Sequence, residues 1–466
     1  MSVRLTVVGG GVTGLAAAWQ ASAEQDVQVT VLESADRLGG KVRTSVLRTD
    51  DGAELRLDEG ADAFLARVPD AVELCRELGL ADELTQPAVG RAKVYVGGDL
   101  HFLPGPTVLG VPLDPAALDA AGLLTAEGVE RAAVELQRRG PGPTEDVAIG
   151  PFLRERYGDE LVDTLVAPLI GGINAGDVEQ LSLQAVTPQL ADAAAEGDSL
   201  SRALARRQQA VSPGPVFHGL RAGTGRLVDA LASALGERGV ELRTSTRLRS
   251  LERAGDGWRL QLEGGEAAEA DTIEADTVVL ATPAPAAAAL LGGPSPDAAA
   301  ELSAIEHSSV VLVTLVYRAA DVPIELDASG FLVPRQAGLL LTAASWGSTK
   351  WAHWDDGEHV VLRVSAGRSG DDRTTQLSDE ALVRALRDDL GTTMGVQAAP
   401  VGVRVSRYPQ GFAQYTVGHL DRVARIEAAM ARDTPGVVVA GAAYRGVGLP
   451  ACIRQGRDAA SRVLAS

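Results

Sequence analysis

The chain of 466 residues is longer than one hydrophobic core usually supports, so two or three domains are expected. Hydrophobic residues make up 45% of it and charged residues 23%, which excludes a disordered chain, a collagen-like repeat and a coiled coil. The formal net charge of −19 disfavours nucleic acid and an anionic membrane surface as partners, unless a local basic pocket exists.

The cysteines and histidines show no metal-binding pattern. Cys75 and Cys452 lie far apart, and the histidines lack HxxH or HxxxH spacing, so we predict no metal site and a reducing compartment. The chain enters an apolar strand without the basic region of a signal peptide. No run reaches the roughly 18 apolar residues of a membrane span. We therefore expect a cytoplasmic protein with at most peripheral membrane contact.

The first motif is a predicted strand, Val3–Val8, followed by a glycine-rich turn and an alanine-rich stretch typical of a helix. In such a unit, Gly9 allows the tight turn, Gly11 lets a pyrophosphate approach the backbone, and Gly14 lets the helix pack on the strand. The free N–H groups at the helix start bind phosphate. The residues assigned to this turn are Gly9, Gly10, Gly11, Val12, Thr13 and Gly14.

A second strand is predicted over Val27–Leu32, and it ends at Glu33. A carboxylate about twenty residues beyond the glycines accepts hydrogen bonds from the ribose of a dinucleotide. A glutamate at this position disfavours a 2′-phosphate. The alternative, a glycine turn in an ordinary α/β unit without a nucleotide, is less favoured because both features occur together.

The residues after Glu33 indicate which dinucleotide is bound. Residues 34–43 hold a second glycine pair and several basic side chains, and residues 57–62 follow soon after. Both stretches resemble the FAD-binding signature of the flavin amine oxidase and protoporphyrinogen oxidase superfamily. The resemblance implies FAD as the cofactor; a solvated loop is the alternative for the two arginines. Near the diphosphate it places Arg37, Lys41 and Arg43, and near the flavin Gly60, Ala61, Asp62 and Ala63. We add Ser34 and Leu248 to the cofactor site.

The pattern in the middle of the chain predicts the remaining strands of the nucleotide-binding fold and an inserted domain. Residues 240–244, 258–262 and 276–283 read as strands of the nucleotide-binding fold. Residues 223–225 are glycine-rich, but we see no strand before them, so we predict a loop and helix cap and no nicotinamide site. Residues 90–215 read as helical segments broken by proline and glycine, which predicts an inserted helical domain.

Inside the insertion, residues 161–173 are apolar but too short and too charged to cross a bilayer. A buried helix ending at Gly171 is the favoured interpretation, and a channel wall facing a substrate is the alternative. Strand-like runs within residues 308–405, such as 310–317 and 359–364, predict a mixed sheet as the floor of a substrate pocket. Ala284–Leu291 predicts a helix or linker without chemistry.

The C-terminal part supplies another glycine-rich turn. Residues 435–441 read as a strand, and residues 446–453 precede the final helix, with Pro450 in its first turn. The N–H groups and positive dipole end at this helix start suit the part of a flavin that becomes negative on reduction. A helix start without a ligand is the alternative. The residues assigned here are Gly441, Val447, Gly448 and Leu449.

Two further motifs narrow the resemblance: Gln414-Tyr415 followed by Gly418-His419, and GVGLP ending at Pro450 with Cys452 after it. Over nearly its whole length the chain resembles the oxygen-dependent protoporphyrinogen and coproporphyrinogen III oxidases of haem synthesis. The resemblance implies an α/β protein with a discontinuous Rossmann-like FAD-binding fold, a mixed-sheet substrate domain and an inserted helical domain. The expected division is 1–62, 216–286 and 410–466 for FAD, 63–89 and 287–409 for substrate, and 90–215 for the insertion.

The same resemblance implies the chemistry. A porphyrinogen loses six electrons in three steps, each passing a hydride to flavin N5, and O2 becomes H2O2. The protein then needs orientation more than a catalytic acid or base, and none is predicted, since GxSxG and HExxH are absent. Gly171 and Gly172 would admit a planar macrocycle, or would cap a helix. Cationic candidates for the propionates, each alternatively a solvated surface charge, are Arg67, Arg91, Lys93 and Arg335.

Coproporphyrinogen III, with four propionates, is favoured over protoporphyrinogen IX because the glycine motifs look bacterial and the Arg and Ala bias fits a GC-rich genome. Another flavin amine oxidase or a desaturase is the alternative enzyme. A non-redox FAD-binding scaffold is the alternative from another class. The resemblance also implies O2 as a partner and transient contact with a ferrochelatase.

Overall fold

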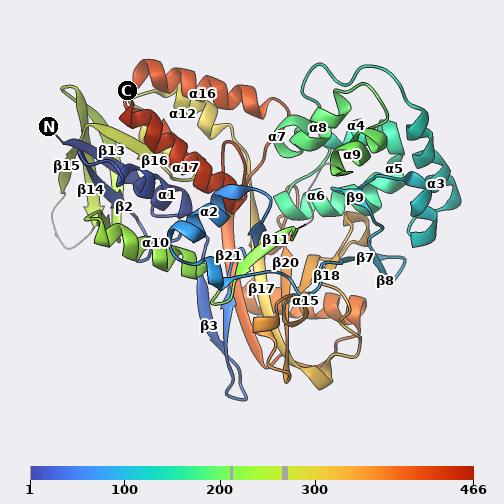
Figure 1. Cartoon of the computed structure of the whole chain (residues 1–466). Coiled ribbons are helices and arrows are strands. Elements are labelled where there is room, and N and C mark those ends of the chain that lie inside the picture. The colour runs from blue at the N-terminus through green and yellow to red at the C-terminus, as the bar shows by residue number, and fades with distance from the viewer. Residues whose placement is uncertain (1, 210–213, 265–270, 466) are drawn as a thin grey trace.

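A five-stranded parallel sheet forms the centre of one lobe of the computed structural model, which describes residues 2–209, 214–264 and 271–465 (Figure 1). Its strands follow the order β12-β2-β1-β16-β22, and every neighbouring pair is parallel. β16 and β22 read as almost continuous apolar runs because both faces of the sheet are covered. The strands are β1 (Val3–Val8), β2 (Val27–Leu32), β12 (Glu241–Arg243), β16 (Thr277–Leu280) and β22 (Val437–Val439).

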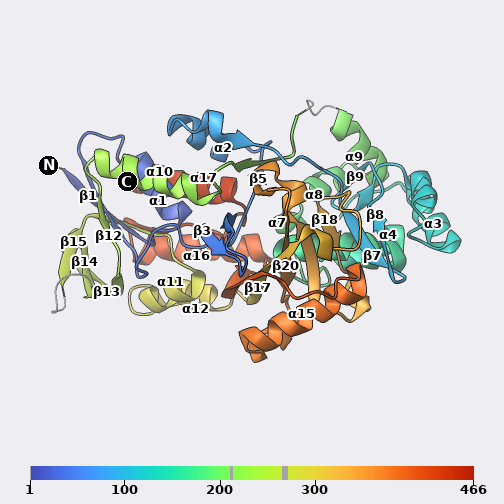
Figure 2. The same cartoon turned by 90° about the horizontal axis from the view of Figure 1, so that it is seen from below.

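Two layers cover this parallel sheet. One face packs on α1 (Val12–Ala21), α2 (Pro69–Glu77), α10 (Gly225–Glu237) and α17 (Leu449–Leu464). The other face packs on β13 (Thr246–Ala254), β14 (Gly257–Gly264) and β15 (Thr272–Ala275), and on α11 (Ala284–Leu291), α12 (Pro296–Ser303) and α16 (His419–Asp433). Figure 2 shows α10 and α2 on one side of the sheet and α11 and α12 on the other. α17 lies so close to α1 that a Cβ on Gly456 would overlap the Thr13 carbonyl oxygen.

The second lobe is a seven-stranded mixed sheet in the order β21-β17-β20-β19-β18-β7-β8. Only β18 and β7 pair in parallel, and α15 (Asp379–Met394) covers one face. The strands are β7 (Lys93–Val96), β8 (Asp99–Phe102), β17 (His307–Arg318), β18 (Gly330–Leu332), β19 (Leu341–Trp346), β20 (His359–Ala366) and β21 (Gly402–Ala413). Smaller elements join the two lobes: β3 (Thr44–Arg48), β4 (Glu54–Asp58), β5 (Phe64–Leu65), β6 (Leu84–Thr85), β11 (Phe217–Leu220), α13 (Gly347–Lys350) and α14 (Arg373–Gln376).

The third lobe is helical and has its own apolar core (Figure 1). Its helices are α3 (Ala126–Ala133), α4 (Ile149–Tyr157), α5 (Asp159–Leu161), α6 (Ala167–Asn174), α7 (Leu183–Val186), α8 (Pro188–Ala194) and α9 (Leu200–Gln209), with the short β9 (Thr107–Val108) and β10 (Val111–Pro112). A π-helical turn, Val162–Val166, joins α5 to α6. Among the described helices, none has the length and apolar character needed to cross a membrane.

The structure departs from the predicted division of the chain at four places. α2 packs on the parallel sheet, so residues 69–77 lie with the first lobe and not with the substrate domain. β7 and β8 complete the seven-stranded sheet, so residues 93–102 lie with the substrate sheet and not with the helical insertion. α11 and α12 pack beside the parallel sheet, so residues 287–303 lie with the first lobe. β21 runs through the boundary predicted at residue 410. In each case strand pairing or apolar packing across the chain sets the boundary, and a local pattern does not report such contacts.

Three local expectations are wrong. α6 does not end at Gly171 but continues to Asn174, where Ala175 caps it in a left-handed conformation with φ 48°. A strand, β11, does precede residues 223–225, although it pairs with β5 and β6 outside the parallel sheet and α10 still begins at Gly225. The strand predicted over residues 258–262 belongs to the separate β13-β14-β15 sheet, not to the nucleotide-binding sheet itself.

Candidate active site

The carboxyl ends of β1, β16 and β22 bring the predicted glycine-rich turns to one edge of the parallel sheet. Gly9 has a left-handed φ of 108°, and a Cβ there would lie 2.6 Å from the Ala281 carbonyl oxygen that follows β16. A Cβ on Gly14 would overlap the Gly9 carbonyl oxygen. A Cβ on Gly11, in contrast, would meet no atom within 4 Å. Gly11 therefore faces open space at the start of α1, as a residue beside a bound pyrophosphate must.

The same edge has further room where the C-terminal turn arrives. Gly441 has φ 136°, and a Cβ on it would meet only the Thr13 hydroxyl, at 3.9 Å. A Cβ on Gly448, the N-cap of α17, would meet only Pro450, at 3.7 Å. The buried Thr282 hydroxyl beyond β16 has no hydrogen-bond partner in the described part of the chain. Open glycines at two helix starts and an unpaired hydroxyl fit a dinucleotide at this edge.

Glu33 lies where the sequence predicted, directly after β2. Its Oε2 accepts the Gly10 N–H at 2.7 Å, and its Oε1 accepts the Ala35 N–H at 2.8 Å. A carboxylate has about four acceptor positions, so it keeps capacity for ribose hydroxyls. The exposed Ser34 donates to Oε1 at 3.3 Å, and the buried Leu248 lies in the same apolar cluster as Leu32 at the end of β2.

The three basic residues of the second glycine stretch have different partners. Arg37 donates to the carbonyl oxygens of Leu38 and Gly40, so it braces its own loop. Arg43 pairs with Glu59 at 3.1 Å and is half exposed. Lys41 reaches across to donate to the Gly411 carbonyl, and burial lowers the pKa of its amine. As a whole residue Lys41 is exposed and, like Arg37, pairs with no carboxylate among the described residues, which suits contact with an anionic cofactor.

A charged cluster that sequence reasoning missed surrounds the segment 60–63. Asp62 accepts hydrogen bonds from Lys350 at 3.0 Å and from the indole of Trp351 at 2.9 Å, and it pairs with Arg363 at 3.2 Å. Burial alone would raise the pKa of Asp62, but the charges of Lys350 and Arg363 hold it well below its usual range. Arg363 also donates to the Gly60 carbonyl. No sequence signal links these residues, which come from a loop, α13 and β20.

The Gln414-Tyr415 and Gly418-His419 motifs support the C-terminal turn from behind. The Tyr415 hydroxyl donates to the Ala442 carbonyl at 2.9 Å and accepts the Gly446 N–H at 2.9 Å. The ring of His419 stacks on that of Tyr415 with centroids 3.9 Å apart, and its Nε2 bonds the Tyr444 carbonyl. The two rings thus fix the backbone that leads to Gly448. Val447 and Leu449 pack into the adjoining apolar clusters.

His419 makes the stability of this region depend on pH. Burial lowers the pKa of His419 to about 4, below the ordinary value near 6.5 that it regains on unfolding. Its stabilising contribution is therefore complete above pH 6.5 and is lost as the pH falls toward 4. At pH 5 we expect a loss of about 2 kcal/mol relative to pH 7 from this residue. Urea unfolding of H419Q should show a smaller loss of unfolding free energy between pH 7 and pH 5 than that of the wild type. An equal loss in the two proteins would contradict this prediction.

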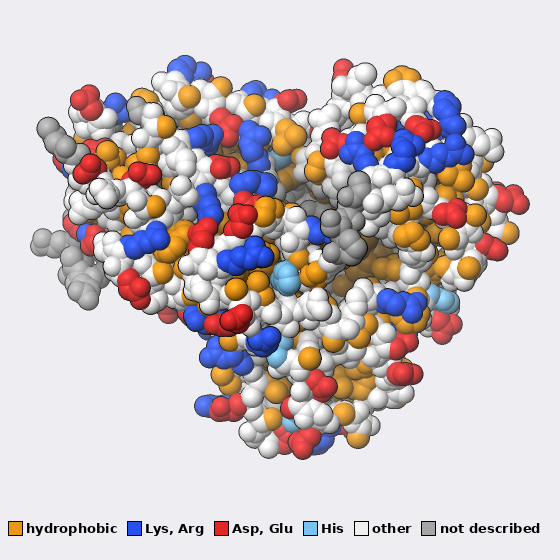
Figure 3. All heavy atoms as spheres, viewed as in Figure 1, with side chains coloured by type: hydrophobic (Ala, Val, Ile, Leu, Met, Phe, Trp, Pro, Cys, Tyr) orange, Lys and Arg blue, Asp and Glu red, His pale blue; other side chains and the backbone are white. Residues whose placement is uncertain are grey.

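The face of the seven-stranded sheet opposite α15 lies against α6. Strand register places Leu332 beside Ala343 and places Ser345 beside Arg363 on this face. A Cβ on Gly172 would contact only Leu332, at 3.6 Å, and Gly172 is exposed. Figure 3 shows a hollow between the helical lobe and the sheet lobe. Small half-buried side chains line this part of the sheet: Thr342, Ala343, Ser345 and Ser365.

Among the cationic candidates, Arg91 and Lys93 lie together at the edge of the sheet. Both contact the ring of Phe102, at 3.6 and 4.6 Å from its centre. Lys93 is paired with Asp327 at 2.6 Å, whereas Arg91 has no ion-pair partner within the described residues. Arg91 is therefore the better placed of the two to meet an anionic group. The other two candidates lie elsewhere: Arg67 is exposed, and Arg335 lies 3.7 Å from Asp177.

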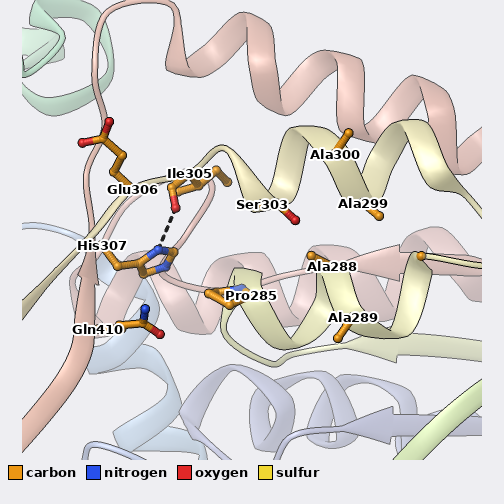
Figure 4. Close-up of a pocket in the computed structure, with 11 residues that line it drawn as sticks. Pro285, Ala288, Ala289, Ala299, Ala300, Ser303, Ile305, Glu306, His307 and Gln410 are labelled. Carbon is orange, nitrogen blue, oxygen red and sulfur yellow. Dashed lines mark hydrogen bonds between the residues drawn. The ribbon is translucent and has the colours of Figure 1, made fainter.

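A separate pocket of about 660 Å³ lies between α11, α12 and the start of β17 (Figure 4). Residues of the two helices, four of them alanines, make up most of its lining, and Glu306, His307 and Gln410 lie at one end. His307 bonds the Ile305 carbonyl at 2.8 Å, and burial lowers its pKa. None of the predicted site residues lines this pocket, so we do not assign the chemistry to it.

The described residues contain no group of three or more His, Cys, Asp and Glu side chains arranged to hold a metal ion. The polar groups gathered here also include no pair of a nucleophile and a base. The edge of the parallel sheet and the adjacent hollow provide hydrogen-bonding and orienting groups. Such a site suits a reaction carried by an organic cofactor.

Comparison with known proteins agrees with this geometry. The family described as "Flavin containing amine oxidoreductase" matches residues 12–464. Coproporphyrinogen III oxidase of Bacillus subtilis is 32% identical, with 99% of this chain and 97% of the relative covered. The enzyme of that name from Mycobacterium tuberculosis is 34% identical, with 98% and 96% covered. A crystal structure from Exiguobacterium sp. 255-15, whose name places it with protoporphyrinogen oxidases, matches with a TM-score of 0.87, 34% identity and 100% of both chains covered. The chain belongs to the family of flavin-containing amine oxidoreductases and uses FAD as its cofactor.

Proposed function

We propose that the protein is an FAD-dependent oxidase that converts coproporphyrinogen III to coproporphyrin III in haem synthesis. The observation that carries the proposal is similarity over practically the entire chain to relatives of that name. The open glycine edge of the parallel sheet and the adjacent hollow support it. Bound FAD supplies the acceptor for the two electrons of each oxidation step, and O2 is the final acceptor.

The residues of this chain bind and orient the cofactor. The turn 9–14 holds the diphosphate with its N–H groups, and Glu33 accepts the ribose hydroxyls. Lys41 adds a cation near the diphosphate. The N–H groups at the start of α17, beside Gly448, would stabilise the negative charge that a bound flavin gains on reduction. The segment 60–63 lies beside the flavin ring.

The substrate occupies the hollow between α6 and the sheet face. Gly171 and Gly172 leave room for a flat macrocycle, and the small side chains at 342–345 and 365 let it lie close to the sheet. Arg91 is free to meet a propionate. No acid or base of the chain is required, because orientation against the flavin is the contribution of the protein.

Filling the hollow from α6 should block the substrate without affecting the cofactor. A phenylalanine at Gly172 would project toward Leu332 into otherwise open space. We expect G172F to raise KM roughly tenfold, equivalent to about 1.4 kcal/mol of binding free energy, with unchanged FAD content. G236F on α10, where a Cβ also meets nothing within 4 Å, is the control. An unchanged KM in G172F would place the substrate elsewhere.

The proposed function is tested by turnover. The FAD-loaded protein is incubated aerobically with coproporphyrinogen III or with protoporphyrinogen IX, and porphyrin fluorescence is followed against a blank without enzyme. Faster oxidation of coproporphyrinogen III is the expected result. Faster oxidation of protoporphyrinogen IX would reverse the choice of substrate. An absence of turnover with both would overturn the porphyrinogen oxidase assignment in favour of another flavin amine oxidase, a desaturase or a non-redox FAD-binding scaffold.

Protoporphyrinogen IX is the second candidate substrate, because the name of the Exiguobacterium structure belongs to that activity. The four carboxylates of coproporphyrinogen III, against two on the alternative, would make cationic contacts in the hollow more important. A cytoplasmic location and peripheral membrane contact stay proposals from the sequence pattern, and transient contact with a ferrochelatase stays a proposal from the resemblance.

A further inference from the structure

The cluster around Asp62 contains more positive than negative charge in a buried place. We define the Asp62 cluster as Asp62, Lys350, Trp351 and Arg363. The side chains of Asp62, Lys350 and Arg363 are 13%, 18% and 7% exposed. Two cations therefore share one carboxylate, and Trp351 adds only a neutral donor. Burying an excess charge is costly unless it serves an interaction, which makes this imbalance informative.

Asp58 is a further carboxylate whose charge acts on Arg363, although the two form no ion pair among the described residues. Asp58 is buried and accepts hydrogen bonds from Thr44 at 2.6 Å and from the Thr224 N–H and hydroxyl at 2.8 and 2.9 Å. Its partners are thus neutral, and burial raises its pKa despite the charge of Arg363. The Nε of Arg363 is buried and has no hydrogen-bond partner in the described part of the chain.

A chain of backbone contacts connects this cluster to the cofactor edge. Arg363 donates to the Gly60 carbonyl, and a Cβ on Gly60 would overlap the Lys41 carbonyl oxygen. Next to Lys41, a Cβ on Gly40 would lie 3.3 Å from the Cα of Gly11. The segments 60–62, 39–41 and 9–14 therefore run side by side. The Asp62 cluster stands directly behind the segment proposed to lie at the flavin ring.

We propose that Lys350 and Arg363 are positioning residues for the flavin: together they hold Asp62 and the Gly60 carbonyl in place, and they put positive charge behind the segment proposed to border the ring. The inference rests on the proposed placement of the segment 60–63 at the flavin. A positive charge in a poorly solvated site favours a state that gains negative charge. The cluster therefore makes reduction of the flavin easier and fixes the orientation of the ring.

The charge is tested by the reduction potential of the FAD-loaded protein, which needs no porphyrinogen. We expect K350M to lower the potential, by about 30 mV for a tenfold change in a two-electron equilibrium. D62N removes the opposite charge and should raise the potential by a similar amount. R425Q on α16, which breaks a surface pair with Glu301 on α12, is the control and should leave the potential unchanged. Unchanged potentials in both K350M and D62N would overturn the proposal.

The positioning is tested by a pair of variants at Arg363. We expect R363M to weaken FAD binding roughly tenfold and to shift the visible flavin absorption band. R363K keeps the positive charge but lacks the planar guanidinium that contacts Asp62 and Gly60 at the same time. It should therefore show the wild-type reduction potential but not the wild-type flavin absorption band. A wild-type band and FAD affinity in R363M would overturn the positioning role. If the potential and the absorption band shift as expected but the protein oxidises neither porphyrinogen, only the proposed substrate is overturned.

Discussion

Replacing Gly11 with alanine is expected to abolish effective FAD binding while leaving the fold intact. The φ of −72° at Gly11 suits any residue, and a Cβ there meets no protein atom within 4 Å, so the apoprotein tolerates it. The methyl group would instead occupy the space needed by the pyrophosphate. We expect FAD affinity to fall roughly 100-fold, equivalent to about 2.8 kcal/mol. Titration of the apoprotein with FAD, followed by flavin fluorescence, measures this directly.

Two other glycines serve as controls for this prediction. G14A puts a Cβ onto the Gly9 carbonyl oxygen, which is backbone and cannot move aside, so it should destabilise the apoprotein itself by about 3 kcal/mol. G236A lies on the open side of α10 and should change neither the FAD affinity nor the stability of the apoprotein. If G11A bound FAD as the wild type does, the pyrophosphate would have to lie away from this turn.

Replacing Glu135 with alanine is expected to destabilise the helical lobe by about 3–5 kcal/mol. The Glu135 side chain is fully buried and pairs with Arg156 at 3.0 Å. It also accepts the Ser199 hydroxyl at 2.6 Å and the Leu200 N–H at the start of α9. Without the carboxylate, a buried guanidinium and the N-terminal amides of a helix lose their partner together.

The matched control for E135A is E155A, which removes a carboxylate from the exposed pair with Arg138 in the same lobe. An exposed ion pair is worth at most about 1 kcal/mol, so E155A should unfold close to the wild type. Urea unfolding followed by tryptophan fluorescence and circular dichroism compares the two. Equal stability of E135A and E155A would show that the buried network does not hold the lobe together.

The nucleotide end of the site was predictable from the sequence because its parts are local. A strand, a glycine turn and a helix start follow one another within the first 21 residues, and β2 ends at Glu33. Gly14 is required by a contact inside that unit, because a Cβ there would overlap the Gly9 carbonyl oxygen. The coproporphyrinogen oxidase resemblance was predictable for the same reason, since GVGLP and Gly418-His419 are short contiguous motifs.

Domain boundaries were less predictable because strand pairing sets them. β7 and β8 follow the predicted start of the helical insertion, yet β7 pairs with β18, more than 200 residues later in the chain. The pattern of residues 93–102 alone cannot indicate which sheet these strands join. The helix containing Gly171 and Gly172 likewise runs on to Asn174, because the left-handed Ala175, and not the glycine pair, ends it.

The sequence by itself determined the class of this protein: a parallel nucleotide-binding sheet, an FAD signature and membership of the flavin amine oxidoreductases, all carried by contiguous motifs. Only the tertiary structure decided which charges meet. Asp62, Lys350 and Arg363 are separated by up to 301 residues, and no spacing rule connects them. The physical reason is that a buried carboxylate takes its partners from whichever elements pack around it, and that packing exists only in the folded chain.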